Sequence, residues 1–426
     1  MRKLTLVFII IAMAVAAPLF AAGGKENAET AKVTIWHSAQ GANATVFEEI
    51  AQTFNDTIGK EKGIEIEAIY QGKANDVLTS VNAASGTGNL PDIAMMDATA
   101  ATDMNHSQYL VTVDKLGIDT SDILACGISS YTSENGLLAL PFNASALLYY
   151  YNKTLYDSLG VNPPKTLDDM AEVMRKTGAK DRAAFAGVPA TFELTTLIGA
   201  QNGLSYMLNN RNGHDGAATE VLFGKEGTYK TFLEKWKAVY DTGFYSPITS
   251  GVTAEFTSGR CAAMLASSSN LASVINSVSG EFEVGVAKVP MVNEKATGGT
   301  VISGGALFSF TDSPAVKTVL EYMISPDVQA KWSEATGYVP VSTKAYETEA
   351  YKTFLEKNPQ YKVAIESLLD SNPGLANVWV PSAYSVYYSF QSNIADVLNG
   401  KDIDAAVSDM VAIVEGAIAS YSAQNN

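Results

Sequence analysis

Residues 141–153 read PFNASALLYYYNK, which joins a polar turn to an aromatic run. Pro141 and Asn143 favour turn conformations, because proline fixes φ and asparagine readily bonds to its own backbone. The run from Leu147 to Tyr151 is apolar and aromatic enough to form a buried strand. Residues 154–156 then have the character of a helix start. We interpret this stretch as a crossover that carries the chain from one lobe to another.

The length and composition point to a folded protein of more than one domain. At 426 residues the chain is too long for one ordinary core, and 47% of its residues are hydrophobic. Its formal net charge is -16, and its Lys and Arg residues are scattered rather than gathered on one predicted face. Since nucleic acids bind to concentrated positive surfaces, the sequence predicts no nucleic-acid partner. The acidity is most simply a solubility feature.

The first residues have the pattern of a cleaved secretory signal. A positive start at residues 1–3 precedes an apolar run over residues 4–20, and small residues follow at 21–23. We therefore predict a signal peptide over residues 1–22 and a periplasmic mature protein. A membrane anchor is the alternative, but the apolar run is shorter than the ~20 residues of a spanning helix and contains Pro18.

The two cysteines bear on two questions, a lipid anchor and a disulfide. Neither Cys126 nor Cys261 lies at the predicted cleavage point, which argues against a lipid anchor. Cys261 lies in an apolar run, where a buried thiol is ordinary. Whether the two cysteines pair stays open.

The first part of the chain alternates between strand and helix patterns. Apolar residues recur at period two over residues 33–36, 64–70 and 91–96, and at helical spacing over residues 46–54 and 77–84. This β-α-β-α-β order predicts a mostly parallel sheet covered by helices. Ligands are expected beyond the carboxyl ends of such strands.

A second lobe is predicted to begin after the crossover. Thr166 and Asp169 have capping-box spacing before a helix. Further along, Ser313-Pro314 and Ser325-Pro326 predict two more helix starts, and residues 336–341 a third crossover. From there to residue 426 the sequence reads as helical. Strands are also expected over residues 261–265, 283–290 and 302–308, with a possible helix N-terminus at residues 267–270.

Motifs for catalysis or cofactors are missing from the sequence. The three histidines are not accompanied by a Gly-x-Ser-x-Gly elbow, and neither phosphate-binding glycine motif is present. Zinc and haem motifs are missing too. We therefore expect no enzyme activity, no cofactor and no metal.

What remains is a set of aromatic and small polar residues at predicted strand ends. These suit a binding cleft, in which aromatic faces cover C–H surfaces and a few polar groups fix hydroxyls. Any one aromatic residue taken alone is more often part of a core. The candidates from this pattern are Tyr70, Asp97, Ser145, Phe192, Ser267, Tyr338 and Trp379.

Several motifs in the same order resemble those of periplasmic solute-binding proteins of ABC importers, with the glycerol-3-phosphate-binding branch nearest. They lie at residues 36–38, 141–153, 259–268, 304–306 and 336–340. The resemblance implies an α/β fold of two lobes joined by three crossovers, closure around one small-molecule solute and delivery to the permease subunits. We expect a monomer. The predicted lobes are 23–143 with 288–324, and 144–287 with 325–426, and closure is expected at crossovers near residues 141–147, 283–290 and 323–338.

The resemblance also implies which residues contact the solute. It places the family's two ligand serines on Ser145 and Ser267, its glycine pair on Gly304 and Gly305, and its tyrosine on Tyr338.

Departures from the glycerol-3-phosphate pattern affect the predicted solute. The branch's first tyrosine falls near Ala74, its glutamate at Asp97, and its stacking tryptophan near Pro189, which leaves Phe192 as the nearest aromatic. Its phosphate-holding arginine falls near Trp379, where no cation stands. Phosphate normally recruits Arg, Lys or helix N-termini, so we expect a neutral saccharide or polyol.

Two alternatives stay open. One is a binding protein for glycerol-3-phosphate or a glycerophosphodiester. The other is a secreted enzyme acting on glycosides, which would need two carboxylates at roughly 5 to 9 Å, with Asp97 and Glu193 as the candidate pair.

Overall fold

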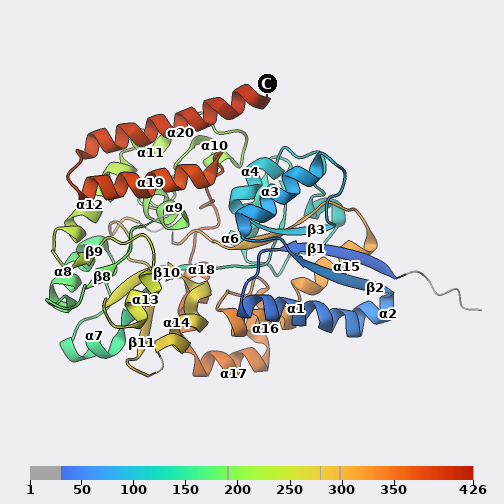
Figure 1. Ribbon diagram of the computed structural model, residues 1–426, viewed down its shortest axis with the longest axis horizontal. Coiled ribbons are helices and arrows are strands. Elements are labelled where there is room, and N and C mark those ends of the chain that lie inside the picture. The colour runs from blue at the N-terminus through green and yellow to red at the C-terminus, as the bar shows by residue number, and fades with distance from the viewer. Residues whose placement is uncertain (1–29, 190, 279, 297–298, 426) are drawn as a thin grey trace, which may run out of the picture.

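The computed structural model describes residues 30–189, 191–278, 280–296 and 299–425. The predicted signal peptide therefore lies outside the described residues. Figure 1 shows two halves, each built around its own five-stranded sheet.

The sheet of the first half has the strand order β2-β1-β3-β12-β6. Its first three strands are parallel and are joined by helices, as the β-α-β-α-β pattern predicts. β12 enters from much later in the chain and runs antiparallel to both of its neighbours, so the sheet is mixed rather than parallel throughout. The strands are β1 (Ala31–His37), β2 (Ile64–Tyr70), β3 (Ile93–Asp97), β6 (Leu140–Pro141) and β12 (Gly305–Ser309).

The sheet of the second half has the order β11-β7-β10-β8-β9. β7, the aromatic strand, pairs antiparallel with β10 on one side and β11 on the other. The strands are β7 (Leu147–Asn152), β8 (Phe185–Ala186), β9 (Tyr245–Ser246), β10 (Ala263–Ser267) and β11 (Val284–Lys288). A short hairpin of β4 (Thr132–Ser133) and β5 (Gly136–Leu137) lies apart from both sheets.

β7 is buried on both faces, which explains its uninterrupted apolar sequence. Leu147 and Tyr149 belong to the core of the second half, whereas Leu148 and Tyr150 belong to a cluster that continues into the first half. Successive side chains of a strand point to opposite faces, so both faces must be apolar.

The remaining elements are helices, and several begin where the sequence predicts. The Thr166 side chain accepts from the Asp169 N–H in a full capping box, and Ser313 caps a helix whose first residue is Pro314. In chain order the helices are α1 (Ala42–Phe54), η1 (Asn55–Gly59), α2 (Lys60–Lys62), α3 (Ala74–Ser85), η2 (Ala98–Ala100), α4 (Ala101–Met104), α5 (Val113–Leu116), α6 (Ala125–Tyr131), α7 (Lys153–Leu159), α8 (Leu167–Thr177), α9 (Thr191–Gly199), α10 (Asn209–Gly213), α11 (Leu222–Lys225), α12 (Thr228–Tyr240), α13 (Val252–Thr257), η3 (Ser268–Asn270), α14 (Leu271–Val278), α15 (Pro314–Met323), α16 (Pro326–Thr336), η4 (Thr343–Glu347), α17 (Glu349–Lys357), α18 (Pro359–Leu369), α19 (Ala383–Leu398) and α20 (Ile403–Asn425).

Three connections between the halves lie side by side. The Ser145 N–H donates to the Ser303 carbonyl at 2.8 Å, and the Ser303 N–H donates back at 2.9 Å. On the other side, the Val339 N–H donates to the Ala144 carbonyl at 2.6 Å. The segment between β6 and β7, the segment between β11 and β12, and the chain after α16 therefore form one narrow ribbon. This confirms the two-lobed α/β architecture with three crossovers.

The expectation of continuous helix after the third crossover is wrong for residues 371–382. This segment has no regular structure, and Pro373, Gly374 and Pro381 explain why a helix does not continue through it. The segment instead runs between the halves, where it contributes to the cleft described below.

The division into lobes by residue range stays a prediction. α16, in the range assigned to the second lobe, packs against both α1 and α14. Its Trp332 lies edge-on to Phe47 of α1, with ring centroids 6.2 Å apart.

Both cysteines, Cys126 and Cys261, are free and buried. Within the described part of the chain, no helix combines the length and apolarity needed to cross a membrane.

Candidate binding cleft

A cavity of about 150 Å³ lies between the two halves. One wall follows the carboxyl end of β3, and the opposite wall comes from α19 and the irregular segment before it. Figure 1 shows β3 and α19 in opposite halves of the molecule. The lining residues are Asp97, Ala98, Thr99, Ser303, Gly304, Asn377, Val378, Tyr384 and Tyr387.

Asp97 is the charged residue of this lining, and its carboxylate is oriented by both halves. Its Oδ1 accepts from the Thr99 N–H at 3.0 Å and from the Thr99 hydroxyl, so Asp97 caps η2. Its Oδ2 accepts from the Tyr384 hydroxyl on α19 at 2.7 Å. A carboxylate offers about four acceptor positions, so three donors leave capacity for one further donor from a solute.

Four tyrosines surround this carboxylate. Burial raises the pKa of Tyr131, Tyr338, Tyr384 and Tyr387, and the negative charge of Asp97 adds to the rise at each of them. The pKa of Tyr387 rises to about 12. All four hydroxyls therefore stay protonated at neutral pH and can donate hydrogen bonds.

Two of these tyrosines are fixed by backbone carbonyls of the cleft. The Tyr131 hydroxyl donates to the Gly304 carbonyl at 3.2 Å, and the Tyr387 hydroxyl lies 3.4 Å from the Val378 carbonyl. The Tyr338 ring stacks on Trp332 with centroids 6.0 Å apart. The cleft thus presents pre-oriented aromatic rings and hydroxyls beside one carboxylate.

The structure brings some of the predicted site residues together. Asp97 and Gly304 line the cavity, and Gly305 pairs with Asp97 in the sheet. Tyr338 lies close enough for the Asp97 charge to add to the burial that raises its pKa. Ser145 is buried in the crossover ribbon beside Ser303, which lines the cavity.

Ser267 lies at the end of β10 but has a local role. Its Oγ accepts from the Ser269 N–H at 3.2 Å and lies 2.9 Å from the Ser269 Oγ, so it caps η3. The Ser269 hydroxyl also hydrogen-bonds to Tyr338. Ser267 is therefore connected to Tyr338 through Ser269.

Tyr70, Trp379 and Phe192 are placed differently. Tyr70 is 53% exposed and lies near His37 on the first half. Trp379 is buried, stacks on His214 and lines a separate cavity. Phe192 is in the first turn of α9, and its side chain lies outside the described residues.

Other residues of the cleft were missed by the sequence reasoning. Asn377, Tyr384 and Tyr387 lie in a region where the sequence predicts helix and, as a site residue, only Trp379. The spacing of Tyr384 and Tyr387 places both on one face of α19, and that face was the available signal. Glu193, the proposed second carboxylate of a glycosidase, is not among the described residues that line the cavity.

The charge of the lining matters for the class of solute. Among the described residues that line the cavity there is one carboxylate and no Lys or Arg. The described part of the chain also holds no cluster of His, Cys, Asp or Glu able to bind a metal ion.

Comparisons with known proteins agree with this architecture. Residues 49–363 match the family described as bacterial extracellular solute-binding protein. The chain is 28% identical over 383 residues to the sn-glycerol-3-phosphate-binding periplasmic protein UgpB of Pectobacterium atrosepticum, which covers 85% of this chain and 84% of that protein. It is 27% identical over 362 residues to UgpB of Salmonella typhimurium, covering 80% and 81%.

Solved structures show the same fold at lower identity. The sugar-binding protein MalE of Xanthomonas citri has a TM-score of 0.76, with 20% identity and coverage of 92% of this chain and 98% of that one. UgpB of Mycobacterium tuberculosis in complex with glycerophosphocholine has a TM-score of 0.73, with 19% identity and coverage of 92% and 99%.

The two halves, the three crossovers, the cleft between them and the family match lead to one conclusion. The chain belongs to the bacterial extracellular solute-binding protein family and is a solute-binding component of an ABC importer.

Proposed function

We propose that this protein captures a neutral saccharide or polyol in the cleft beside Asp97 and delivers it to the permease of its importer. The observation that carries the proposal is the lining of the cavity, which offers one carboxylate and tyrosine hydroxyls but no cationic side chain among the described residues. Hydroxyl groups can donate to Asp97 and accept from tyrosines, and aromatic rings can cover C–H surfaces.

The same lining disfavours a phosphate. Two like unit charges 4 Å apart repel by about 4 kcal/mol at the effective dielectric constant of a protein surface. A phosphate beside Asp97 would meet this repulsion, and the lining offers no Lys or Arg to offset it.

The size of the cavity supports a small solute. Ligand pockets typically enclose about 300–1,000 Å³, so a cavity of about 150 Å³ is small. In the lobe arrangement of the structure, this space suits a polyol or a single sugar ring better than an oligosaccharide.

A second candidate is glycerol-3-phosphate or a glycerophosphodiester. It is favoured by the relatives, whose names state that they bind sn-glycerol-3-phosphate, and by the neighbour in complex with glycerophosphocholine. We also propose that the protein is exported through a signal peptide at residues 1–22. It would then act in the periplasm as a monomer without catalytic activity.

A thermal-shift panel of neutral and phosphorylated solutes tests the proposal. The panel holds glycerol, common monosaccharides, maltose, glycerol-3-phosphate and glycerophosphocholine. A solute present at 100 times its Kd adds about 2.7 kcal/mol to the folded state and raises Tm measurably. We expect a neutral member to raise Tm and glycerol-3-phosphate to leave it unchanged, whereas the reverse result establishes the second candidate.

A pair of tyrosine variants then locates the solute. Tyr384→Phe removes the donor to Asp97, whereas Tyr388→Phe, on the same helix, alters a side chain that is 63% exposed. We expect calorimetry with the identified solute to show weaker binding by about 1–2 kcal/mol for Tyr384→Phe and no change for Tyr388→Phe. Equal affinities for both variants would place the solute elsewhere.

A further inference from the structure

The turn at α10 has a strained backbone. Asn210, Arg211 and Asn212 have φ of +51°, +51° and +59°, so three consecutive residues with a Cβ lie in the left-handed region. Asparagine enters this region more easily than most residues do, but as a single residue rather than in a run. Strained backbone persists only where its surroundings hold it, and it is frequent at functional sites. The contacts of this turn therefore indicate what it is for.

On one side, the turn holds the irregular segment that forms a wall of the solute cavity. The Asn212 side chain donates to the Ala376 carbonyl at 2.9 Å, and the Asn212 carbonyl accepts from the Trp379 N–H at 2.9 Å. Between these two bonds, the segment contributes Asn377 and Val378 to the lining of the cavity. The turn therefore fixes the position of this wall.

On the other side, Arg211 holds the end of α6 in the first half. Its Nη1 donates to the Ser129 carbonyl at 3.3 Å and to the Ser129 hydroxyl at 3.2 Å, and its Nη2 donates to the Thr132 carbonyl at 3.1 Å. Its Nε donates to the Asp215 carboxylate at 3.1 Å, which orients the guanidinium from its own half. A planar guanidinium can make these bonds together, whereas a lysine ammonium is a single point charge.

The two residues that Arg211 contacts in the first half flank a tyrosine of the cleft. The Tyr131 hydroxyl donates to the carbonyl of Gly304, which lines the cavity. The Tyr131 ring lies edge-on to Phe308 of β12, with centroids 6.0 Å apart, so the end of α6 belongs firmly to the first half. Arg211 therefore connects the two walls of the cavity from behind.

Arg211 itself is placed to support the cleft rather than to contact the solute. It is not among the described residues that line the cavity. Its side chain is only 17% exposed, and each of its three guanidinium nitrogens already donates to a protein oxygen.

We propose that Arg211 is a positioning residue of the binding cleft, which clamps the end of α6 to the turn at α10 and so stabilises the arrangement in which the two cavity walls face each other. The inference rests on the proposed function in one respect, that the cavity beside Asp97 holds the solute. Loss of the clamp lowers the fraction of molecules with a complete cleft, and the apparent Kd rises by the same factor.

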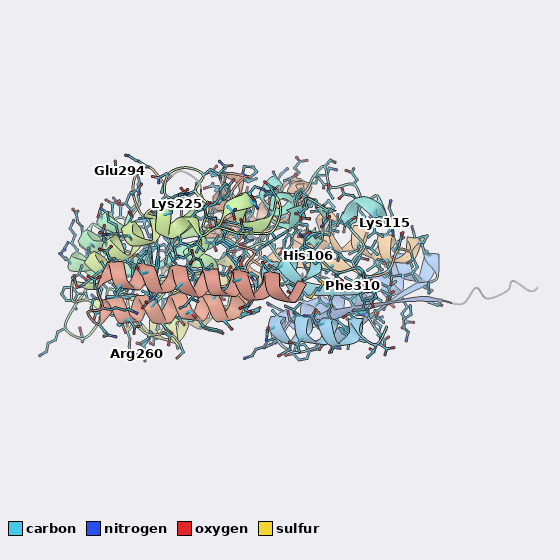
Figure 2. All side chains as sticks on the ribbon, turned by 90° about the horizontal axis from the view of Figure 1, so that it is seen from above. His106, Lys115, Lys225, Arg260, Glu294 and Phe310 are labelled. Carbon is cyan, nitrogen blue, oxygen red and sulfur yellow. The ribbon has the colours of Figure 1, made fainter. Side chains whose placement is uncertain are left out.

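Distance measurements between two spin labels test the clamp without any solute. Lys115→Cys and Lys225→Cys supply the attachment sites, because both side chains are exposed and Figure 2 shows them in opposite halves. The two native cysteines are buried. We expect the labelled protein to show a short-distance population, in which the halves are together. Arg211→Met should lower the ratio of this population to the longer distances roughly three- to tenfold.

Arg182→Met is the matched control. The Arg182 guanidinium also donates to a backbone carbonyl, that of Thr177 at 3.1 Å, but both residues belong to the second half. Its loss should leave the distances between the halves unchanged. Arg211→Lys should give an intermediate result, because an ammonium cannot replace the whole fork of donors. Urea unfolding of each labelled variant checks that it is folded.

Solute affinity supplies the second measurement. For a panel member that raises Tm, we expect calorimetry to show a roughly three- to tenfold higher Kd for Arg211→Met and the wild-type Kd for Arg182→Met. Unchanged distances or an unchanged Kd for Arg211→Met, or the same shift in the Arg182→Met control, overturn the inference. If the distances and the Kd respond but only a phosphorylated member binds, the clamp stands and the proposed function is wrong.

Discussion

Gly304 occupies the tightest point of the crossover ribbon. Its φ is +115°, a region that side chains with a Cβ rarely adopt. A Cβ added there would lie 1.5 Å from the Asn143 carbonyl oxygen. The glycine therefore allows the first and second crossovers to approach each other, and its own carbonyl accepts from Tyr131 in the cleft.

We predict that Gly304→Ala lowers the free energy of unfolding by about 2–4 kcal/mol, because it adds both backbone strain and a clash with backbone. Urea denaturation measures the change. Gly416→Ala is the control, since Gly416 lies in α20 with no atom within 4 Å of an added Cβ, and it should raise stability by about 0.5–1 kcal/mol. A Gly304→Ala variant as stable as the wild type would mean that the ribbon can relax.

At the scale of elements, the turn at α10 connects the second half to the first. Asn210, Arg211 and Asn212 all have positive φ, and the Asn212 side chain holds the turn by accepting from two backbone N–H groups, those of Met207 and Leu208. Arg211 donates to the carbonyls of residues 129 and 132 across the halves. The turn thus places both Arg211 and His214 at the junction.

His214 makes this junction sensitive to pH. Burial, with a smaller effect from the Arg211 charge, lowers the pKa of His214 to about 4, although the two carbonyls and Asp215 act in the opposite direction. In the unfolded chain its pKa is about 6.5. Between these values the unfolded chain takes up a proton that the folded protein does not, so stability falls as the pH falls below about 6.5.

We predict that His214→Gln removes this contribution. Between pH 7 and pH 5, the wild type should lose about 2 kcal/mol more unfolding free energy than the variant does. Urea denaturation at both pH values measures the difference, and His37, whose pKa is also lowered by burial, is unchanged in both proteins. The same pH dependence in both proteins would show that His214 is not buried as a neutral group.

At the scale of the whole molecule, the cleft is built from both halves around one narrow ribbon. Asp97 belongs to the first half and Tyr384 to the second, and their hydrogen bond spans 287 positions in the sequence. A solute that contacts both walls must therefore favour the arrangement in which the walls are close together.

We predict that saturation with the solute identified by thermal shift lowers the radius of gyration, because the halves rotate together at the ribbon. Small-angle scattering of the free and the saturated protein measures this change. A solute that leaves scattering unchanged in both wild type and Tyr384→Phe would indicate that the lobes are already together without it.

The sequence determined the local elements and the family. Period-two and helical patterns, capping residues and the 141–153 stretch all act over short distances. They therefore predicted the longer strands, the starts of α8, α15 and α16, and the crossover ribbon, but not the two-residue strands. The sequence also placed Asp97 at the end of one strand and the glycine pair at the start of another, and the structure has them there.

Only the tertiary structure decided what surrounds Asp97 and where Trp379 lies. The contact between Asp97 and Tyr384, and the stacking of Trp379 on His214, join residues far apart in the sequence and leave no local pattern. The prediction of helix fails at residues 371–382 because the prolines there interrupt any repeating helical pattern. Local physics therefore specifies the elements here, whereas the faces of the cleft depend on how the two halves meet.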